Sequence, residues 1–412
     1  MAKPGQPMNN RDLSPFTPGS PVPVDLFVGR EDKIKEIIRC IKRTSSGKQE
    51  NIFLSGNRGI GKSSLASFIR HYAGMKENFI GIHVFVGRVS TLEEMVRNIF
   101  DRLLKETKGE TWFEQISKFF GSYIKEIGLF GVSVAFNPPE RDLKKLVDNF
   151  AEALSNVIKK IEGEKTGLLI ILDDINGLVE SPEFANWYKS FADDVATHYR
   201  SFPVLLMLAG LPEKRATLAK HQPSLMRIFK VIEIGKLSYD DTYQFFSRAF
   251  EKAGVKVERN EMELMVNNSS GLPSLMQEIG DAVLRIDKDG VISFRDTVDG
   301  TFAAAEEVGK KYLDPKVYNS IRSKRYRSTL RKLGKLMTGK EVGAVGWHKF
   351  NKGELFTKLD ENEKRVFNNF LRKMVSLGVI ERDIEEGMGF YKFTNEIYPV
   401  YIGLESLSPD SS

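Results

Sequence analysis

The fold of this chain is decided by one short loop, Gly56-Asn57-Arg58-Gly59-Ile60-Gly61-Lys62-Ser63-Ser64, which matches the pattern G-x-x-x-x-G-K-[ST]. In this pattern the glycines let consecutive backbone N–H groups curl around a polyphosphate, because side chains there would block its approach. Lys62 supplies a positive charge for the β- and γ-phosphates, and the hydroxyl of Ser63 is a ligand for Mg²⁺. We therefore expect every residue from Gly56 to Ser64 to contact a bound nucleoside triphosphate.

The residues on either side of the loop give it the setting that it requires. Asn51–Ser55 reads as a short apolar strand, and Ser64–Arg70 carries apolar residues at helical spacing. A helix that begins at the loop directs its free N–H groups and the positive end of its dipole at the phosphates. The alternative, a glycine-rich turn that binds nothing, leaves this strand–loop–helix order unexplained.

A second half of the site follows about 110 residues later in the chain, where the apolar run Gly167–Leu172 ends in Asp173 and Asp174. In a parallel sheet the carboxyl ends of the strands open onto the ligand crevice, so both carboxylates are expected to face the phosphates. Asp173 is placed to hold Mg²⁺, and Asp174 is placed to orient and deprotonate an attacking water. The alternative role for either residue is a helix N-cap.

Three further apolar segments indicate the fold class. They are Phe79–Val86, Phe202–Ala209 and Phe229–Ile234. Strands that are apolar on both faces and alternate with helices indicate a parallel sheet covered by helices on both sides. The sequence therefore predicts an α/β fold with a phosphate-loop core.

Composition narrows the class of protein. Of the 412 residues, 41% are hydrophobic and 28% are charged, which is typical of a soluble globular protein. The longest apolar runs are too short to span a bilayer, and the start of the chain lacks the apolar core of a secretory signal. The single cysteine excludes a disulfide framework and fits a reducing cytoplasm. No two of the five histidines have metal-ligand spacing, so Mg²⁺ is the metal that we expect.

The pattern along the chain predicts several parts. Their order is a flexible or extended proline-rich arm at 1–25, the phosphate-loop core at 26–236 with an insertion at 108–145 and a hairpin around Gly131–Phe136, a helical lid at 237–312, a basic unit at 313–405, and a polar tail at 406–412.

At this point the chain resembles a known family. Phe27-Val28-Gly29-Arg30-Glu31 is similar to the segment of AAA+ and STAND ATPases that contacts adenine, and Gly271-Leu272-Pro273 resembles a motif of STAND proteins and archaeal origin-recognition initiators. The resemblance covers residues 26–405. It implies nucleotide contacts at Val28, Gly29, Arg30 and Pro273, with ATP binding, slow hydrolysis and a shape change between nucleotide states.

Three departures from the family pattern favour a slow switch over a processive motor. Ser274 occupies the position of a lid arginine, and the strand ending at Ala209 lacks a polar residue at its tip. Asp174 stands where fast motors usually have glutamate. An arginine donated to a neighbouring subunit would imply a nucleotide-dependent homo-oligomer, and Arg227 is the first candidate, with Arg215 the second. A solvated arginine or a local ion pair is an equal alternative for both.

The basic unit carries ten lysines and arginines between 310 and 335, opposed there by Asp314 alone. A predicted helix at Glu363–Leu377 has one apolar face and one polar face, and a β-hairpin follows it, as in the recognition helix and wing of a winged helix. The expected DNA contacts are Arg325, Arg327, Lys364, Arg365, Asn368 and Arg372. The alternative is a winged helix that contacts protein.

Two functions remain open on these grounds. The first is an ATP-dependent and Mg²⁺-dependent switch ATPase that couples its nucleotide state to double-stranded DNA. The second is a STAND-like signalling or defence switch that oligomerises and recruits a separately encoded protein effector without binding DNA. A small-molecule kinase is disfavoured, because no substrate site or arginine-rich phosphate lid accompanies the loop.

Overall fold

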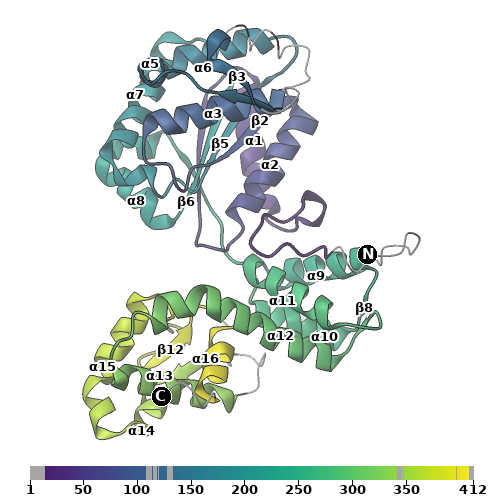
Figure 1. Ribbon diagram of the computed structural model, residues 1–412, viewed down its shortest axis with the longest axis vertical. Coiled ribbons are helices and arrows are strands. Elements are labelled where there is room, and N and C mark those ends of the chain that lie inside the picture. The colour runs from purple at the N-terminus through teal and green to yellow at the C-terminus, as the bar shows by residue number, and fades with distance from the viewer. Residues whose placement is uncertain are drawn as a thin grey trace. The chain divides into compact units, whose positions relative to one another are not determined.

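The computed structural model describes residues 14–107, 114, 118, 120–127, 133–340, 346, 348–395 and 397–407. The chain divides into two compact units (Figure 1). The first, called here the core unit, comprises Pro23–Gly235. The second, called the lid unit, comprises the chain up to Val22 together with Lys236 onward.

The core unit is built on a five-stranded parallel sheet, which confirms the predicted α/β fold. Its strands, in the order in which they lie side by side, are β2 (Phe79–Phe85), β5 (Gly167–Asp173), β6 (Val204–Gly210), β1 (Glu50–Ser55) and β7 (Lys230–Glu233). The register pairs Ser55 with Gly210 and Asp173 with Ala209, so the strand that precedes the phosphate loop and the strand that ends in the acids finish at one edge.

Helices cover both faces of this sheet (Figure 1). They are α1 (Glu31–Ser45), α2 (Lys62–Glu77), α3 (Leu92–Thr107), α5 (Glu140–Asp148), α6 (Phe150–Ile161), α7 (Pro182–His198) and α8 (Pro212–His221). Alternate strand residues point to opposite faces. Ile170 and Leu172 join the apolar core beneath α3, α6 and α7, whereas Leu169 and Ile171 are buried on the opposite face, with α1 and α2.

Short elements complete the core unit. They are η2 (Val24–Leu26), η3 (Gly121–Tyr123), η4 (Leu178–Glu180), η5 (Pro223–Arg227), and the antiparallel pair β3 (Ile124–Ile127) and β4 (Ser133–Phe136). The pair lies in the predicted insertion, and β4 falls within the predicted hairpin. The residues between these two strands lie outside the described part of the chain.

The part of the lid unit that corresponds to the predicted helical lid, from α9 to α12, is helical, as predicted. It contains α9 (Tyr239–Ala253), α10 (Arg259–Ser269), α11 (Pro273–Ile286), α12 (Phe294–Val308) and the short parallel pair β8 (Lys256–Val257) and β9 (Val291–Ile292). Capping boxes begin α9 at Ser238 and α12 at Ser293. Each satisfies N–H groups that have no partner within the helix.

The prediction of a flexible arm over residues 1–25 is wrong for the described residues from Ser14 to Val22. The ring of Phe16 is 3% exposed and packs against Phe245 and Phe250 of α9. Ser14 donates a hydrogen bond to Asp281 of α11 at 2.8 Å. The proline-rich composition gave no sign of this packing, which depends on the burial of one aromatic ring.

A second apolar core lies at the C-terminal end of the lid unit. It is formed by η6 (Gly309–Tyr318), α13 (Lys324–Thr338), β10 (Lys349–Asn351), α14 (Lys352–Thr357), α15 (Glu361–Ser376), β11 (Ile380–Arg382), β12 (Phe390–Phe393) and α16 (Tyr398–Leu407). The strands form one antiparallel sheet in the order β10-β12-β11. The boundary expected near 312 falls inside η6, and α16 extends into the expected tail, of which 408–412 lie outside the described residues.

No helix in the described part of the chain is both long enough and apolar enough to cross a membrane.

Candidate functional site

The phosphate loop connects β1 to α2 in the core unit. Gly59 and Gly61 have φ angles of 75° and 88°, in the left-handed region that glycine adopts without strain. Lys62 is the first residue of α2, and its Nζ donates hydrogen bonds to the backbone oxygens of Gly56 at 2.8 Å and Asn57 at 3.0 Å. The ammonium group of Lys62 therefore bridges two backbone oxygens at the start of the loop.

Lys62 also links the loop electrostatically to the acids at the end of β5. Burial lowers the pKa of the Lys62 ammonium, and the nearby carboxylates of Asp173 and Asp174 act in the opposite direction. The structure thus brings the loop and the two acids, which are about 110 residues apart in the chain, into one electrostatic environment.

Asp173 is the last residue of β5 and is 2% exposed. Its Oδ2 lies 2.9 Å from Nε2 of His83, a buried residue of the neighbouring strand β2. The ring of His83 stacks on Phe85, with ring centroids 4.6 Å apart. Sequence reasoning missed His83 because it sought histidines at metal-ligand spacing. The signal that could have identified His83 is its place near the carboxyl end of β2, the strand that lies beside β5 in the sheet.

Asp174 has a φ angle of 60°, a left-handed conformation that is uncommon outside glycine but enriched in Asp and Asn. Its Oδ1 accepts a hydrogen bond from the side-chain amide of Asn176, and a Cβ at Gly87 would lie 2.5 Å from its Oδ2. The Asn176 Oδ1 lies 3.5 Å from the backbone nitrogen of Leu211, just after β6. Asn176 was not predicted from the sequence. Its side chain lies beside the end of β6, the strand that has no polar residue of its own at its tip.

The segment expected to contact adenine leads directly into α1. Val28 is 7% exposed, and Gly29 and Arg30 both have left-handed φ angles, of 69° and 67°. Arg30 Nη2 donates to the backbone oxygen of Ile60 in the phosphate loop at 2.5 Å. This arginine therefore supports the loop directly, and contact of these three residues with nucleotide stays a prediction.

The candidate arginines for a neighbouring subunit differ in their surroundings. Arg227 is exposed at the end of η5. Arg215 of α8 forms an ion pair with Glu233 at 2.6 Å, which agrees with the local alternative for that residue. Pro273 begins α11 in the lid unit, and its contact with nucleotide also stays a prediction.

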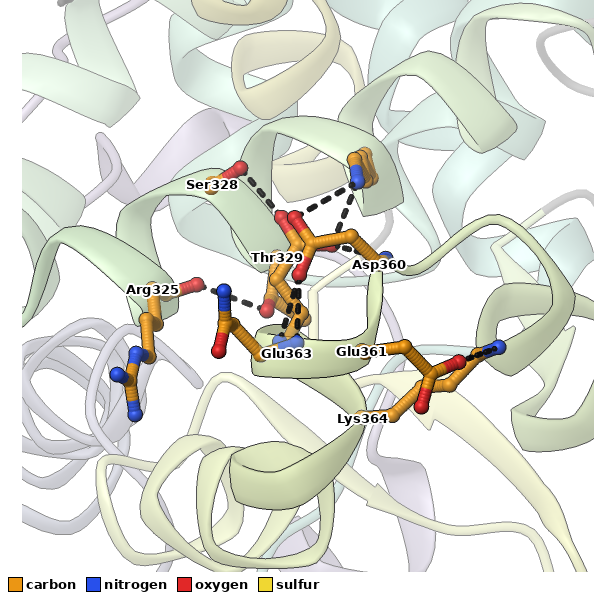
Figure 2. Close-up of polar contacts among 9 residues, drawn as sticks. Arg325, Ser328, Thr329, Asp360, Glu361, Glu363 and Lys364 are labelled. Atoms are coloured by element: carbon orange, nitrogen blue, oxygen red, sulfur yellow. Dashed lines mark hydrogen bonds and ion pairs between the residues drawn. The ribbon is translucent and has the colours of Figure 1, made fainter.

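A separate polar cluster positions α15, the helix expected to carry DNA contacts (Figure 2). Glu363 is 1% exposed and accepts hydrogen bonds from Ser328 and Lys332 of α13, each at 2.5 Å. Asp360 caps the first turn of α15, and its backbone N–H donates to Glu363 at 2.8 Å. Burial raises the pKa of Glu363, but the hydrogen bonds from Lys332 and Ser328 outweigh it and hold the pKa below its usual value.

The expected DNA contacts fall into two groups. Lys364 is engaged locally, by an ion pair with Glu361 at 2.9 Å (Figure 2). Arg327 donates to the backbone oxygens of Ile321 and Tyr318, at 3.0 Å and 3.3 Å, so it holds the chain that leads into α13. The remaining four are exposed on α13 and α15, although Arg372 also donates to Asn369, at 2.9 Å; they are Arg325, Arg365, Asn368 and Arg372.

The parallel sheet, the loop between β1 and α2 and the acids at the end of β5 define a P-loop NTPase. Residues 26–193 match the model of the AAA ATPase domain. This region is therefore similar to the AAA ATPase domain, and the resemblance predicted from its motifs is confirmed here.

Solved structures share the fold over nearly the whole chain. The Walker-type ATPase PABY2304 of Pyrococcus abyssi aligns with 95% of this chain and 99% of its own, at a TM-score of 0.54 and 16% identity. The ORC2 protein of Aeropyrum pernix, solved in ADPNP–ADP complexes, aligns with 92% of this chain and 95% of its own, at a TM-score of 0.55 and 13% identity. At this level of identity the likeness concerns the fold alone.

A curated relative is named an uncharacterized HTH-type transcriptional regulator, MJ0774, of Methanocaldococcus jannaschii. It is 26% identical over 244 residues, which is 56% of this chain and 54% of the relative. The chain thus spans about half the length of this relative.

Proposed function

We propose that this chain binds ATP together with Mg²⁺ and hydrolyses it slowly. The observation that carries the proposal is that the phosphate loop after β1 and the acids at the end of β5 lie at one edge of the parallel sheet, where the carboxylates of Asp173 and Asp174 oppose the lowering of the Lys62 pKa by burial. A cation beside two carboxylates is the arrangement that holds the β- and γ-phosphates and their metal in P-loop enzymes. The AAA ATPase domain match over residues 26–193 supports this proposal.

The side chains at this edge fit Mg²⁺, which prefers oxygen ligands and commonly binds through one or two carboxylates plus substrate phosphates. Ser63 offers a hydroxyl in the first turn of α2, and Asp173 offers a carboxylate at the end of β5. These two residues would hold the ion. When bound, it neutralises charge on the phosphates.

Asp174 is the residue that we propose to orient and deprotonate the attacking water. Asn176 holds one of its oxygens, so the side chain is confined before substrate arrives. The carboxylate of aspartate reaches less far than that of glutamate, which favours slow turnover and a switch over a motor. Val28, Gly29 and Pro273 would contact the nucleotide, and Arg227 would reach the γ-phosphate of a neighbouring copy.

We further propose that the nucleotide state is coupled to double-stranded DNA through the C-terminal part of the lid unit. There the order helix, strand, two helices, two strands and helix, from α13 to α16, supports the predicted winged helix. Arg365, Asn368 and Arg372 share the exposed face of α15, and Arg325 is exposed on α13. The name of the archaeal relative, an HTH-type transcriptional regulator, is consistent with this proposal.

One observation favours the second candidate, a switch that recruits a protein effector. The loop between β11 and β12, where a wing would lie, exposes Ile384 and Met388 at 91% and 102%. Glu385 and Glu386 stand between them, also exposed. Carboxylates at this place repel a phosphate backbone, whereas exposed apolar side chains are typical of contacts with protein.

Salt-dependent DNA binding separates the two candidates. The intact protein is titrated onto a labelled duplex with ATP, with ADP and without nucleotide. If Arg325, Arg365 and Arg372 each neutralise one phosphate, the slope of log K against log salt is about −2.7. Arg365→Ala should reduce that slope by about 0.9, and Arg39→Ala, exposed on α1, should leave it unchanged. Affinity that depends neither on salt nor on nucleotide would refute the DNA proposal.

A further inference from the structure

His83 and Asp173 form a buried pair at the edge of the core sheet where the nucleotide site is proposed. The register pairs His83 with Ile171 and Phe85 with Asp173 across the parallel strands β2 and β5. Because alternate residues share a face, His83 and Asp173 project from the same side of the sheet. Ile82 and Val84 belong to the core under α3, so His83 faces the opposite side, on which α2 packs.

The geometry of this pair suits a hydrogen bond from the ring to the carboxylate. Nε2 of His83 lies 2.9 Å from Asp173 Oδ2, and a carboxylate oxygen accepts, so the bond forms when Nε2 carries the hydrogen. The imidazole is confined on its other side by Phe85, whose ring lies nearly parallel to it at an interplanar angle of 23°. Within the described part of the chain, Oδ1 of Asp173 accepts no hydrogen bond.

We infer that His83 is a positioning residue for the metal-binding carboxylate. Its N–H fixes the rotamer of Asp173 through Oδ2 and leaves Oδ1 available to a cation. This inference rests on the proposed nucleotide and Mg²⁺ site and deepens it. Partners that orient a metal ligand in this way typically change metal affinity by about 10-fold to 100-fold when they are removed.

The chain offers a matched set of variants for the test. His83→Leu removes the donor and keeps an apolar group of similar bulk, whereas His83→Gln keeps an N–H at a reach close to that of Nε2. His198→Leu is the control, because His198 is hydrogen-bonded to the carboxylate of Asp194 at 2.7 Å on the exposed surface of α7. This third variant breaks a histidine–aspartate pair away from the site.

Binding of a fluorescent ATP analogue is measured in EDTA and then during a Mg²⁺ titration. We expect the affinity in EDTA to be unchanged in all three variants, because the phosphate loop is intact. His83→Leu should raise the Mg²⁺ concentration for half-maximal enhancement at least about 10-fold, and His83→Gln should restore most of it. The His198→Leu protein should behave as wild type.

An unaltered Mg²⁺ requirement in His83→Leu would overturn the inference. A wild-type protein that binds no nucleotide in either condition would instead refute the proposed function, so the two failures are distinguishable. If His83→Leu does not fold, the tautomer of His83 in the wild-type protein decides the matter by nitrogen NMR, with the signal assigned by its loss in His83→Gln. The inference requires the Nε2–H form, and an Nδ1–H form would overturn it.

Discussion

Replacing Asp174 with asparagine should lower ATP turnover by orders of magnitude while leaving the fold and nucleotide binding in place. The structure indicates that this change removes the carboxylate without disturbing the local backbone or the hydrogen bond from Asn176. The φ angle of 60° at this position is one that asparagine adopts readily, and the amide oxygen of the new side chain can still accept the hydrogen bond from Asn176. What is lost is the base, because an amide cannot take a proton from water at neutral pH.

The size of the effect follows from the role proposed for this carboxylate. A positioned general base contributes about 10²- to 10⁴-fold to a rate, which corresponds to about 3–5 kcal/mol of activation free energy. The free energy of unfolding should change by no more than about 0.5 kcal/mol, since no buried apolar contact is removed. Removing one negative charge beside the triphosphate should leave ATP affinity unchanged or raise it.

Three measurements on the same protein test this reasoning. Steady-state phosphate release gives the turnover, a fluorescent ATP analogue gives the affinity, and thermal unfolding reports the fold. The control is Asp193→Asn on α7, which makes the same chemical change at an exposed position paired with Lys189. Turnover that is unchanged in Asp174→Asn would show that the water is activated by another group, and the assignment of Asp174 would be wrong.

Two further predictions concern the lid unit. Phe16→Ala should lower its free energy of unfolding by about 3–5 kcal/mol, because it empties a buried aromatic site, whereas Phe294→Ala, 63% exposed on α12, should change it by less than about 0.5 kcal/mol in calorimetry. Equal effects would show that Phe16 is not anchored. Glu363→Gln should cost about 1–3 kcal/mol at neutral pH, because a charge-assisted bond to Lys332 is lost. Since the folded pKa of Glu363 is below its usual 4.5, its contribution is present above that pH and is lost as the pH falls through the folded pKa, so wild type and variant should converge in acid unfolding curves.

The core of this protein could be predicted from its sequence because the relevant signals are local. The phosphate loop is nine consecutive residues between a strand and a helix, and the run Gly167–Leu172 is apolar at every position. Such a run is typical of a strand buried on both faces, and parallel strands end at a common edge. The prediction that Lys62 lies near Asp173 and Asp174 follows from those two facts, and the register places the ends of β1 and β5 at one edge of the sheet.

Other features needed three-dimensional information. Local composition predicted a flexible or extended arm around Phe16, yet the residue packs among rings of α9 that lie more than two hundred residues away. Arg327 was predicted to contact DNA as part of a basic run. In the structure its side chain donates hydrogen bonds to backbone oxygens of the segment before α13. For Phe16 the deciding partners are distant in sequence, so no local pattern could name them. For Arg327 the partners lie only six and nine residues earlier in the chain, but the contact depends on how the backbone turns before α13.

The sequence alone thus determined a loop with the phosphate-binding pattern on a parallel sheet, since these depend on short-range backbone geometry and on short runs of apolar residues. Only the tertiary structure decided which side chains surround the two acids, with His83 beside Asp173 and Asn176 beside Asp174. The physical reason is that hydrogen bonds between side chains depend on strand register and on loop conformation. Both are set by packing of the whole unit and not by neighbours in the chain.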